Sequence, residues 1–338
     1  MGSPPSPTPV VCTAPEEDVL QYIIRRLLIS IPVFFGITAI AFAALAAAPG
    51  DPIYAMVDPQ ALQQMTPESI ENLRREFGLD QPAPIRYVKW VRELASGNLG
   101  YSISSRRSIE EELGSRLGPT LQLMGAALAI GLVVGIPLGM VAATRQYSKL
   151  DYALTVWSFG MIAVPPFFFG LILIYVLGVH FQVLPTGGRS TLGEDPTLVD
   201  TVKHMIMPAT VLGLGFAAPI MRYVRSSMLE VLRQDYLTTA RAKGLAETKV
   251  LVRHAARNGI LPVVTVIGLH LPELVAGAVI TEQVFQWPGM GQMAVKAATS
   301  RDPSLMQGVV LVVGVAVLVS NLVVDIVYTI IDPRIRYG

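Results

Sequence analysis

The stretch LGPTLQLMGAALAIGLVVGIPLGMVAAT, residues 117–144, contains no charged side chain. Residues 27–50 and 152–188 are likewise free of Asp, Glu, Lys and Arg. Each run exceeds the roughly 18 apolar residues that a helix needs to cross about 30 Å of hydrocarbon. Because lipid offers the backbone no hydrogen-bond partners, a helix is the default structure there. With 52% hydrophobic and 15% charged residues among 338, the chain is predicted to be an all-α integral membrane protein.

Apolar segments of sufficient length recur along the chain and predict six transmembrane helices. The expected spans are residues 27–48, 121–143, 152–177, 205–221, 259–280 and 308–331. The pair Pro165-Pro166 predicts a break in the third span, because proline lacks the N–H that a helix interior uses. The fourth span is expected to continue as a helix beyond the lipid.

Basic residues predict the orientation, because they accumulate in short cytoplasmic loops. The N-terminal tail, the 144–151 loop, the 222–257 loop and the C-terminal tail together hold fourteen Lys or Arg, against four in the 178–204 and 281–307 loops. Both termini are therefore expected in the cytoplasm. We divide the chain into a Pro- and Ser-rich disordered cytoplasmic tail (1–18), a first helix with a large extracytoplasmic helical loop (19–116), a transmembrane core (117–332) and a short cytoplasmic tail (333–338).

The large extracytoplasmic loop is expected to contain two helices. Thr66-Pro67 is typical of an N-cap followed by proline at the first helical position, and Gly78 of the C-terminal stop. Residues 84–95 predict a second, amphipathic helix. This pair either caps the outer mouth or receives a soluble partner, or it only packs against the outer helix ends.

Three glycines of the second span, Gly131, Gly135 and Gly139, recur at four-residue spacing and so share one helix face. Small residues in such a stripe let two helix backbones approach closely in lipid. We interpret them as a packing surface.

The longest polar segment of the core, residues 222–257, contains TTARAKGL at 238–245 and has eight basic against three acidic residues. It is a solvated loop that fixes topology, a helix on anionic lipid, or a docking element for a soluble partner. Docking is favoured because Gly244 predicts a sharp turn between two short helices. The second of these helices offers apolar residues at Leu245 and 250–252 among charged ones, which suits a groove on another protein.

The segment DYLTTARAKGL followed by RHAARNGILP resembles the cytoplasmic loop of ATP-binding-cassette (ABC) importer permeases. The stretches APGDP, GLDQP, GNLGYSI, QVFQWPGMGQ and NLVVDIVYTIIDPRIR are similar to the dipeptide/oligopeptide/nickel branch, over about residues 20–336. Thr239-Ala240-Arg241 stands where the wider superfamily has Glu-Ala-Ala, and the stretch from Gly244 to Pro262 is longer than in sugar importers. Both departures are similar to the peptide branch.

The resemblance implies a coupling helix that sits in a cleft of a cytoplasmic ATPase subunit. The residues implied to form it are Thr239, Ala240, Gly244, Leu245, Ala246, Glu247, Lys249, Val250, Arg253 and His254. The implied partners are a second homologous permease, two cytoplasmic ATP-binding subunits and an extracytoplasmic solute-binding protein, in a bacterial or archaeal cell membrane. The implied substrate is a di- or oligopeptide or a similar solute, with glutathione and chelated nickel left open.

Several chemistries are not expected. The chain has no G-x-x-x-x-G-K-[ST] phosphate loop, so ATP hydrolysis is assigned to partner subunits and the chain is not expected to be an enzyme. A membrane-embedded hydrolase would need a nucleophile–base pair or a metal site, and neither pattern occurs. The four histidines lack metal-ligand spacing, and the single cysteine, Cys12, excludes an internal disulfide. No cofactor and no nucleic-acid partner is expected.

Ionisable groups inside the predicted spans are costly and face protein or water. His270 and Glu273 share a face of the fifth span; they either line the translocation path or form a structural hydrogen bond. A stand-alone, ion-coupled secondary transporter using this pair is the alternative function. Asn321 and Asp325 are expected to tie to a basic group of the neighbouring loop. Glu282 is expected at the outer water interface.

Overall fold

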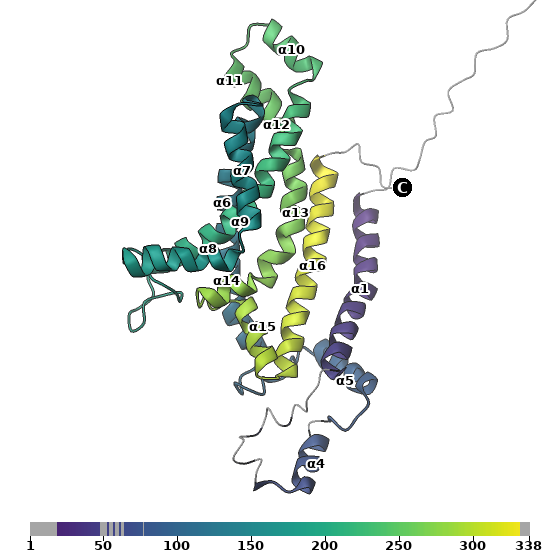
Figure 1. Ribbon diagram of the computed structural model, residues 1–338. Helices are drawn as coiled ribbons and strands as arrows, with labels where there is room; N and C mark the ends of the chain where they lie inside the picture. Colours follow the sequence, from purple (N-terminus) through teal and green to yellow (C-terminus); the bar gives the residue numbers. More distant parts are fainter. Residues whose placement is uncertain are drawn as a thin grey trace, which may run out of the picture.

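The computed structural model describes residues 19–47, 53, 57, 61, 64–76 and 78–331, and these form an elongated bundle of helices (Figure 1). Within those ranges the only extended pairing is an isolated bridge between Tyr101 and Ser108. The all-α prediction is therefore confirmed for the described part of the chain. The expected tails, 1–18 and 333–338, lie outside the described residues.

Two long helices, α6 (Ile109–Thr144) and α9 (Leu198–Val231), form the centre of the bundle. The predicted glycine stripe lies in their interface: a Cβ on Gly135 would come within 2.8 Å of the Ala217 carbonyl oxygen, and one on Gly139 within 2.6 Å of that of Met221. The packing interpretation is thus confirmed. Both helices extend beyond the predicted spans, because α6 begins at the Ser108 N-cap and α9 continues past the apolar region, as expected.

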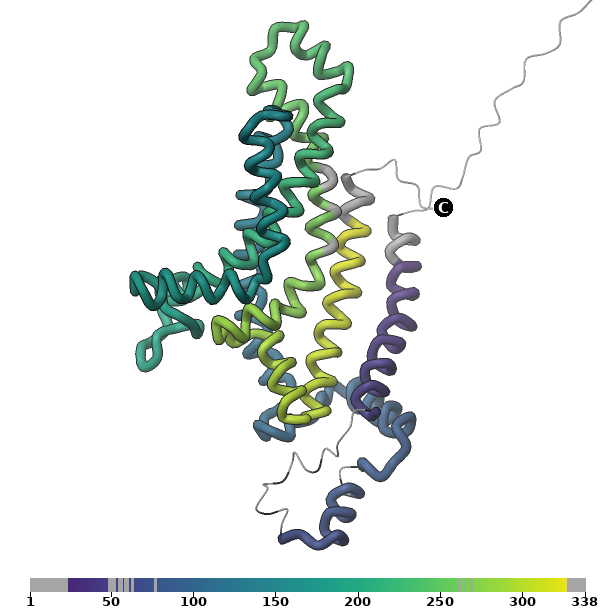
Figure 2. The backbone as a smooth tube through the Cα atoms, viewed as in Figure 1, coloured from purple at the N-terminus to yellow at the C-terminus, as the bar shows by residue number. Residues whose placement is uncertain are grey.

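The third predicted span is broken, as Pro165-Pro166 indicated. Helix α7 (Lys149–Ala163) ends before the proline pair, and α8 (Pro166–Leu173) continues into a π-helical turn, η1 (Ile174–His180), at 99° to α7. Val164 precedes a proline and adopts an extended backbone, which ends the helix. The α8 arm projects sideways from the bundle (Figure 2).

The remaining core helices are α13 (Leu261–Ala276), α16 (Pro303–Ile331) and α1 (Val19–Ala47). Helix α13 stops at Gly277, which has φ 79°. The predicted fifth span, 259–280, is therefore wrong at its C-terminal end, because a backbone break places Ile280 in α14 (Val279–Val284).

Among the described residues, four helices are long and apolar enough to span a membrane: 24–47, 109–144, 198–231 and 303–326. The bent α7–α8 pair makes a fifth if it is counted as one broken span, and α13 is shorter. A multi-pass membrane protein is confirmed, and the six-span topology stays a prediction.

Helices α1 and α16 are tied by Arg26, whose Nε lies 3.1 Å from the Asp325 carboxylate. The expected structural role of Asp325 is thus confirmed. The basic group seen here belongs to α1, whereas the tie to a neighbouring loop stays a prediction.

The end of the bundle that carries the α1–α5 loop also holds α4 (Pro67–Glu76), α5 (Ala83–Ala95), α14 and α15 (Met290–Thr299) (Figure 1). Thr66 caps α4 by accepting from the Ser69 N–H, and Gly78 follows the helix with φ 63°, as predicted. Helix α5 packs on α1, with the Tyr87 hydroxyl 2.9 Å from Thr38 Oγ1. Packing against a helix end is therefore confirmed for α5.

Candidate functional site

The polar segment singled out in the sequence forms the opposite end of the bundle (Figure 1). It consists of α10 (Asp235–Ala242), α11 (Glu247–Lys249), a π-helical turn η2 (Val250–Ala255) and α12 (Ala256–Gly259). Gly244 follows the C-cap of α10 with φ 75°, and its N–H donates to the Arg241 carbonyl at 2.9 Å. The predicted turn is confirmed, and it needs glycine because side chains rarely adopt this conformation.

The ten residues assigned to coupling divide between two faces of this segment. Exposed are Thr239, Gly244, Ala246, Glu247, Lys249 and Arg253; half-buried are Leu245 and His254; buried are Ala240 and Val250. Ala240 and Val250 belong to the hydrophobic cluster that also contains Met228 and Leu237, and Leu245 packs against it.

The apolar face predicted for docking is therefore turned mostly inward, which corrects that part of the sequence interpretation. The segment folds back on the end of α9 because burying these side chains stabilises it. Two large hydrophobic side chains remain exposed there, Val252 at 62% and Tyr236 at 42%. The exposed surface of this segment is therefore mostly polar.

Arg241 and Glu247 bracket the Gly244 turn. The Arg241 Nη2 and Nε groups donate to the Glu247 carboxylate at 2.9 and 3.1 Å. These hydrogen bonds lower the pKa of Glu247 and raise that of Arg241. The pair is exposed, so its contribution to stability is small, but it orients the exposed turn.

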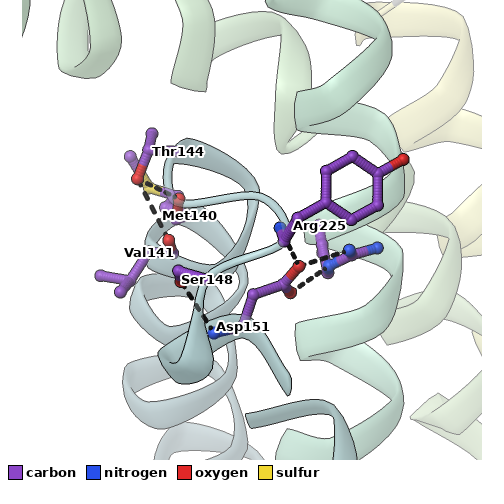
Figure 3. Close-up of polar contacts among 7 residues, drawn as sticks. Met140, Val141, Thr144, Ser148, Asp151 and Arg225 are labelled. Carbon is purple, nitrogen blue, oxygen red and sulfur yellow. Dashed lines mark hydrogen bonds and ion pairs between the residues drawn. The ribbon is translucent and has the colours of Figure 1, made fainter. Parts of the chain in front are cut away.

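A partly buried ion pair, Asp151–Arg225, supports this end of the molecule (Figure 3). The guanidinium is bidentate, with Nε and Nη2 donating to the two carboxylate oxygens at 2.7 and 2.8 Å. The Tyr147 N–H also donates to Asp151, and Ser148 caps α7 by accepting from the Asp151 N–H. The pair joins the first turn of α7 to α9.

Sequence reasoning missed this pair. The available signal was the spacing of Ser148 and Asp151, which is typical of a helix N-terminus. Ser148 and Asp151 indicate where α7 begins. Their spacing does not identify Arg225, 74 residues away, as the partner of Asp151.

His270 and Glu273 contact each other in α13. His270 Nδ1 lies 2.9 Å from Glu273 Oε2, and the His270 ring lies 4.9 Å from that of Phe216. The Glu273 side chain is 56% exposed in this single chain. A carboxylate on an apolar helix is not stable against lipid, so this face of α13 belongs to water or to a partner.

Glu282 is fully buried, which overturns its expected place at the water interface. Its carboxylate accepts from the Thr120 hydroxyl at 3.0 Å and from the Gln292 N–H at 2.9 Å. Nearby, the Trp287 indole N–H donates to the Pro119 carbonyl at 2.9 Å. These contacts fix the α14–α15 turn, the QVFQWPGMGQ stretch, onto α6.

Among the described residues, no group of three or more His, Cys, Asp or Glu side chains is placed to hold a metal ion. The geometry offers an exposed, mostly polar turn at one end of the bundle and a face of α13 that carries His270 and Glu273.

Comparisons with known proteins agree with this arrangement. The family model for the binding-protein-dependent transport system inner membrane component matches residues 135–337, and the model for the N-terminal part of such membrane components matches residues 19–123. The oligopeptide transport system permease protein AppB of Bacillus subtilis is 44% identical over 94% of this chain and 99% of its own length. The dipeptide transport system permease protein DppB of Escherichia coli K12 is 40% identical with the same coverage.

A solved structure of the MetNI methionine ABC transporter in an inward-facing conformation shares the fold, with a TM-score of 0.52 and 15% identity over 65% of this chain and 96% of that one. Permeases of this family work with ATPase and solute-binding subunits and are not themselves catalytic. The chain therefore belongs to the binding-protein-dependent transport system inner membrane components, the permease subunits of ABC importers.

Proposed function

We propose that this chain is one of two homologous permease subunits of a peptide importer, paired as a heterodimer with two cytoplasmic ATP-binding subunits and an extracytoplasmic solute-binding protein. The observation that carries the substrate class is the 40–44% identity to permeases of dipeptide and oligopeptide transport systems over nearly the whole chain. The complex sits in a bacterial or archaeal cell membrane with both termini in the cytoplasm. The tails 1–18 and 333–338, the outer region 19–116 and the core 117–332 are its functional divisions.

The ATPase contact is proposed at the exposed side of the turn: Thr239, Gly244, Ala246, Glu247, Lys249, Val252 and Arg253. Leu245 and His254, both half-buried, flank this contact. Ala240 and Val250 support it from beneath, since their side chains are buried. ATP binding and release in the partner would move this turn, and the buried cluster with Asp151–Arg225 below it would carry the motion into α7 and α9.

The test is Gly244→Pro against the matched control Gly97→Pro. Both glycines follow a helix C-cap at positive φ, 75° and 82°, and both N–H groups donate to a helix carbonyl. Proline is equally incompatible with both positions. We expect Gly244→Pro to lose co-purification of the ATPase subunits and Gly97→Pro to keep it, with both chains inserted in the membrane. Normal substrate-stimulated ATP hydrolysis in Gly244→Pro would refute the docking role.

The orientation is tested with cysteine labelling, because Cys12 is the single cysteine. In a Cys12→Ser background, Lys243→Cys should react with a membrane-impermeant maleimide only in inside-out vesicles. Arg106→Cys, in the outer region, should react only from the opposite side. Labelling of both from one side would overturn the proposed topology.

His270 and Glu273 are proposed to line the translocation path. The support is the exposure of Glu273 on an otherwise apolar helix. Glu273→Gln keeps the shape and removes the charge, so it should change the relative transport rates of charged and neutral peptides. Unchanged relative rates would leave the hydrogen bond to His270 as a purely structural contact.

A further inference from the structure

A pocket lined by Met293, Val295 and five polar side chains lies between α6, α14 and α15, at the end of the bundle opposite the coupling turn. Its volume is about 350 Å³, within the roughly 300–1,000 Å³ typical of small-molecule sites. The polar side chains that line it are Arg116, Gln283, Gln292, Lys296 and Thr299. The pocket thus carries two cations, two amides and a hydroxyl, and no carboxylate.

The two cations have no anionic partner among the described residues. Arg116 Nη1 donates to the neutral Gln292 Oε1 at 3.2 Å, and Lys296 forms no ion pair. Glu112, one helical turn before Arg116, does not pair with it. The Glu282 carboxylate lies behind the Gln292 backbone and is occupied by the Gln292 N–H and the Thr120 hydroxyl.

The pocket wall is rigid. Glu282 holds the Gln292 backbone, and Thr120 Oγ1 accepts from the Met290 N–H at 2.7 Å, so the start of α15 is fixed against α6. The Gln292 side chain in turn orients the Arg116 guanidinium. A planar guanidinium held in place with free donors suits a carboxylate, which it can bind in bidentate fashion.

We propose that this pocket binds the terminal carboxylate of the peptide substrate on the extracytoplasmic side, before the peptide enters the path. The proposal rests on the peptide-import function proposed above. Arg116 and Lys296 supply the charge, while the amides of Gln283 and Gln292 and the Thr299 hydroxyl supply hydrogen bonds to the peptide backbone.

Chemical protection tests occupancy of the pocket directly. The full complex in lipid nanodiscs is treated with phenylglyoxal, and modification of each arginine is followed by mass spectrometry. Trialanine should protect Arg116 and leave Arg301 reactive, since Arg301 is exposed and does not line the pocket. Trialanine amide should protect neither. Equal protection of Arg116 by both peptides would overturn the carboxylate assignment.

Transport kinetics test the consequence. Arg116→Gln and Lys296→Gln should each raise the apparent KM for trialanine about tenfold, the loss expected for one charge-assisted hydrogen bond, while Arg301→Gln should not. An unchanged KM in both pocket variants would overturn the site and leave the import function intact. Protection of Arg116 by the solute-binding protein without peptide would assign the pocket to that protein and overturn the substrate site. Failure of the wild-type complex to transport any peptide would overturn the proposed function itself.

Discussion

Replacing Gly139 by alanine should destabilise the protein, whereas the same change at Gly125 should stabilise it. Both glycines lie in α6. A Cβ on Gly139 would lie 2.6 Å from the Met221 carbonyl oxygen and 2.6 Å from Val224 Cβ, whereas one on Gly125 would meet nothing within 4 Å. The pair isolates helix–helix packing from the intrinsic helix preference of alanine.

The magnitudes follow from the contact distances. Non-bonded carbon atoms settle about 3.5–4.0 Å apart, so α6 and α9 would have to separate by about 1 Å at Gly139. Overpacking of this kind lowers the free energy of unfolding by about 1–3 kcal/mol. Replacing a helical glycine by alanine raises it by about 0.5–1 kcal/mol, because alanine loses less backbone entropy on folding. We therefore expect Gly139→Ala to lose about 1 kcal/mol of stability and Gly125→Ala to gain about 0.5–1 kcal/mol.

Thermal unfolding of the purified complex in one detergent measures both changes. For a chain of 338 residues, 1 kcal/mol corresponds to roughly 1–2 °C in Tm, so the two variants should move in opposite directions by about that amount. If Gly139→Ala is as stable as Gly125→Ala, the α6–α9 interface does not rely on the glycine stripe, and the reasoning from close backbone approach is wrong.

Three further predictions concern charged groups. Asp151→Asn should lower stability by roughly 2–4 kcal/mol, because it leaves the partly buried Arg225 without its charge partner. Thermal unfolding measures this loss. Partial recovery of stability in the Asp151→Asn, Arg225→Met double variant would show that the unpaired charge is the cause. Glu282→Ala should lower stability by about 2 kcal/mol or more in the same assay, because the buried Thr120 hydroxyl and Gln292 N–H lose their acceptor. A stability equal to wild type would contradict the anchoring role. The Glu247–Arg241 contact should be fully present above the ordinary glutamate pKa and be lost as the pH falls through the lowered pKa of Glu247; carboxyl NMR should show that pKa returning toward its usual range in Arg241→Gln.

Features set by local chemistry were predictable from the sequence. Charge-free runs identified the long helices, Pro165-Pro166 identified the broken one, and Gly244 identified the turn of the candidate coupling segment. The glycine stripe of α6 was correctly interpreted as packing. Each of these depends on one continuous stretch of sequence, so no knowledge of distant partners was needed.

The two carboxylates Glu273 and Glu282 show where such reasoning fails. The sequence placed Glu273 in the middle of the fifth span and Glu282 at the water interface beyond its outer end. In the structure the helix ends at Gly277 and the Glu282 carboxylate turns inward. Burying a carboxylate is costly unless it is hydrogen-bonded, and one donor, Thr120, lies 162 residues away. Glu273 remains 56% exposed because no element among the described residues covers it. Burial of an acid is therefore decided by where distant donors converge, and only the assembled fold supplies that information.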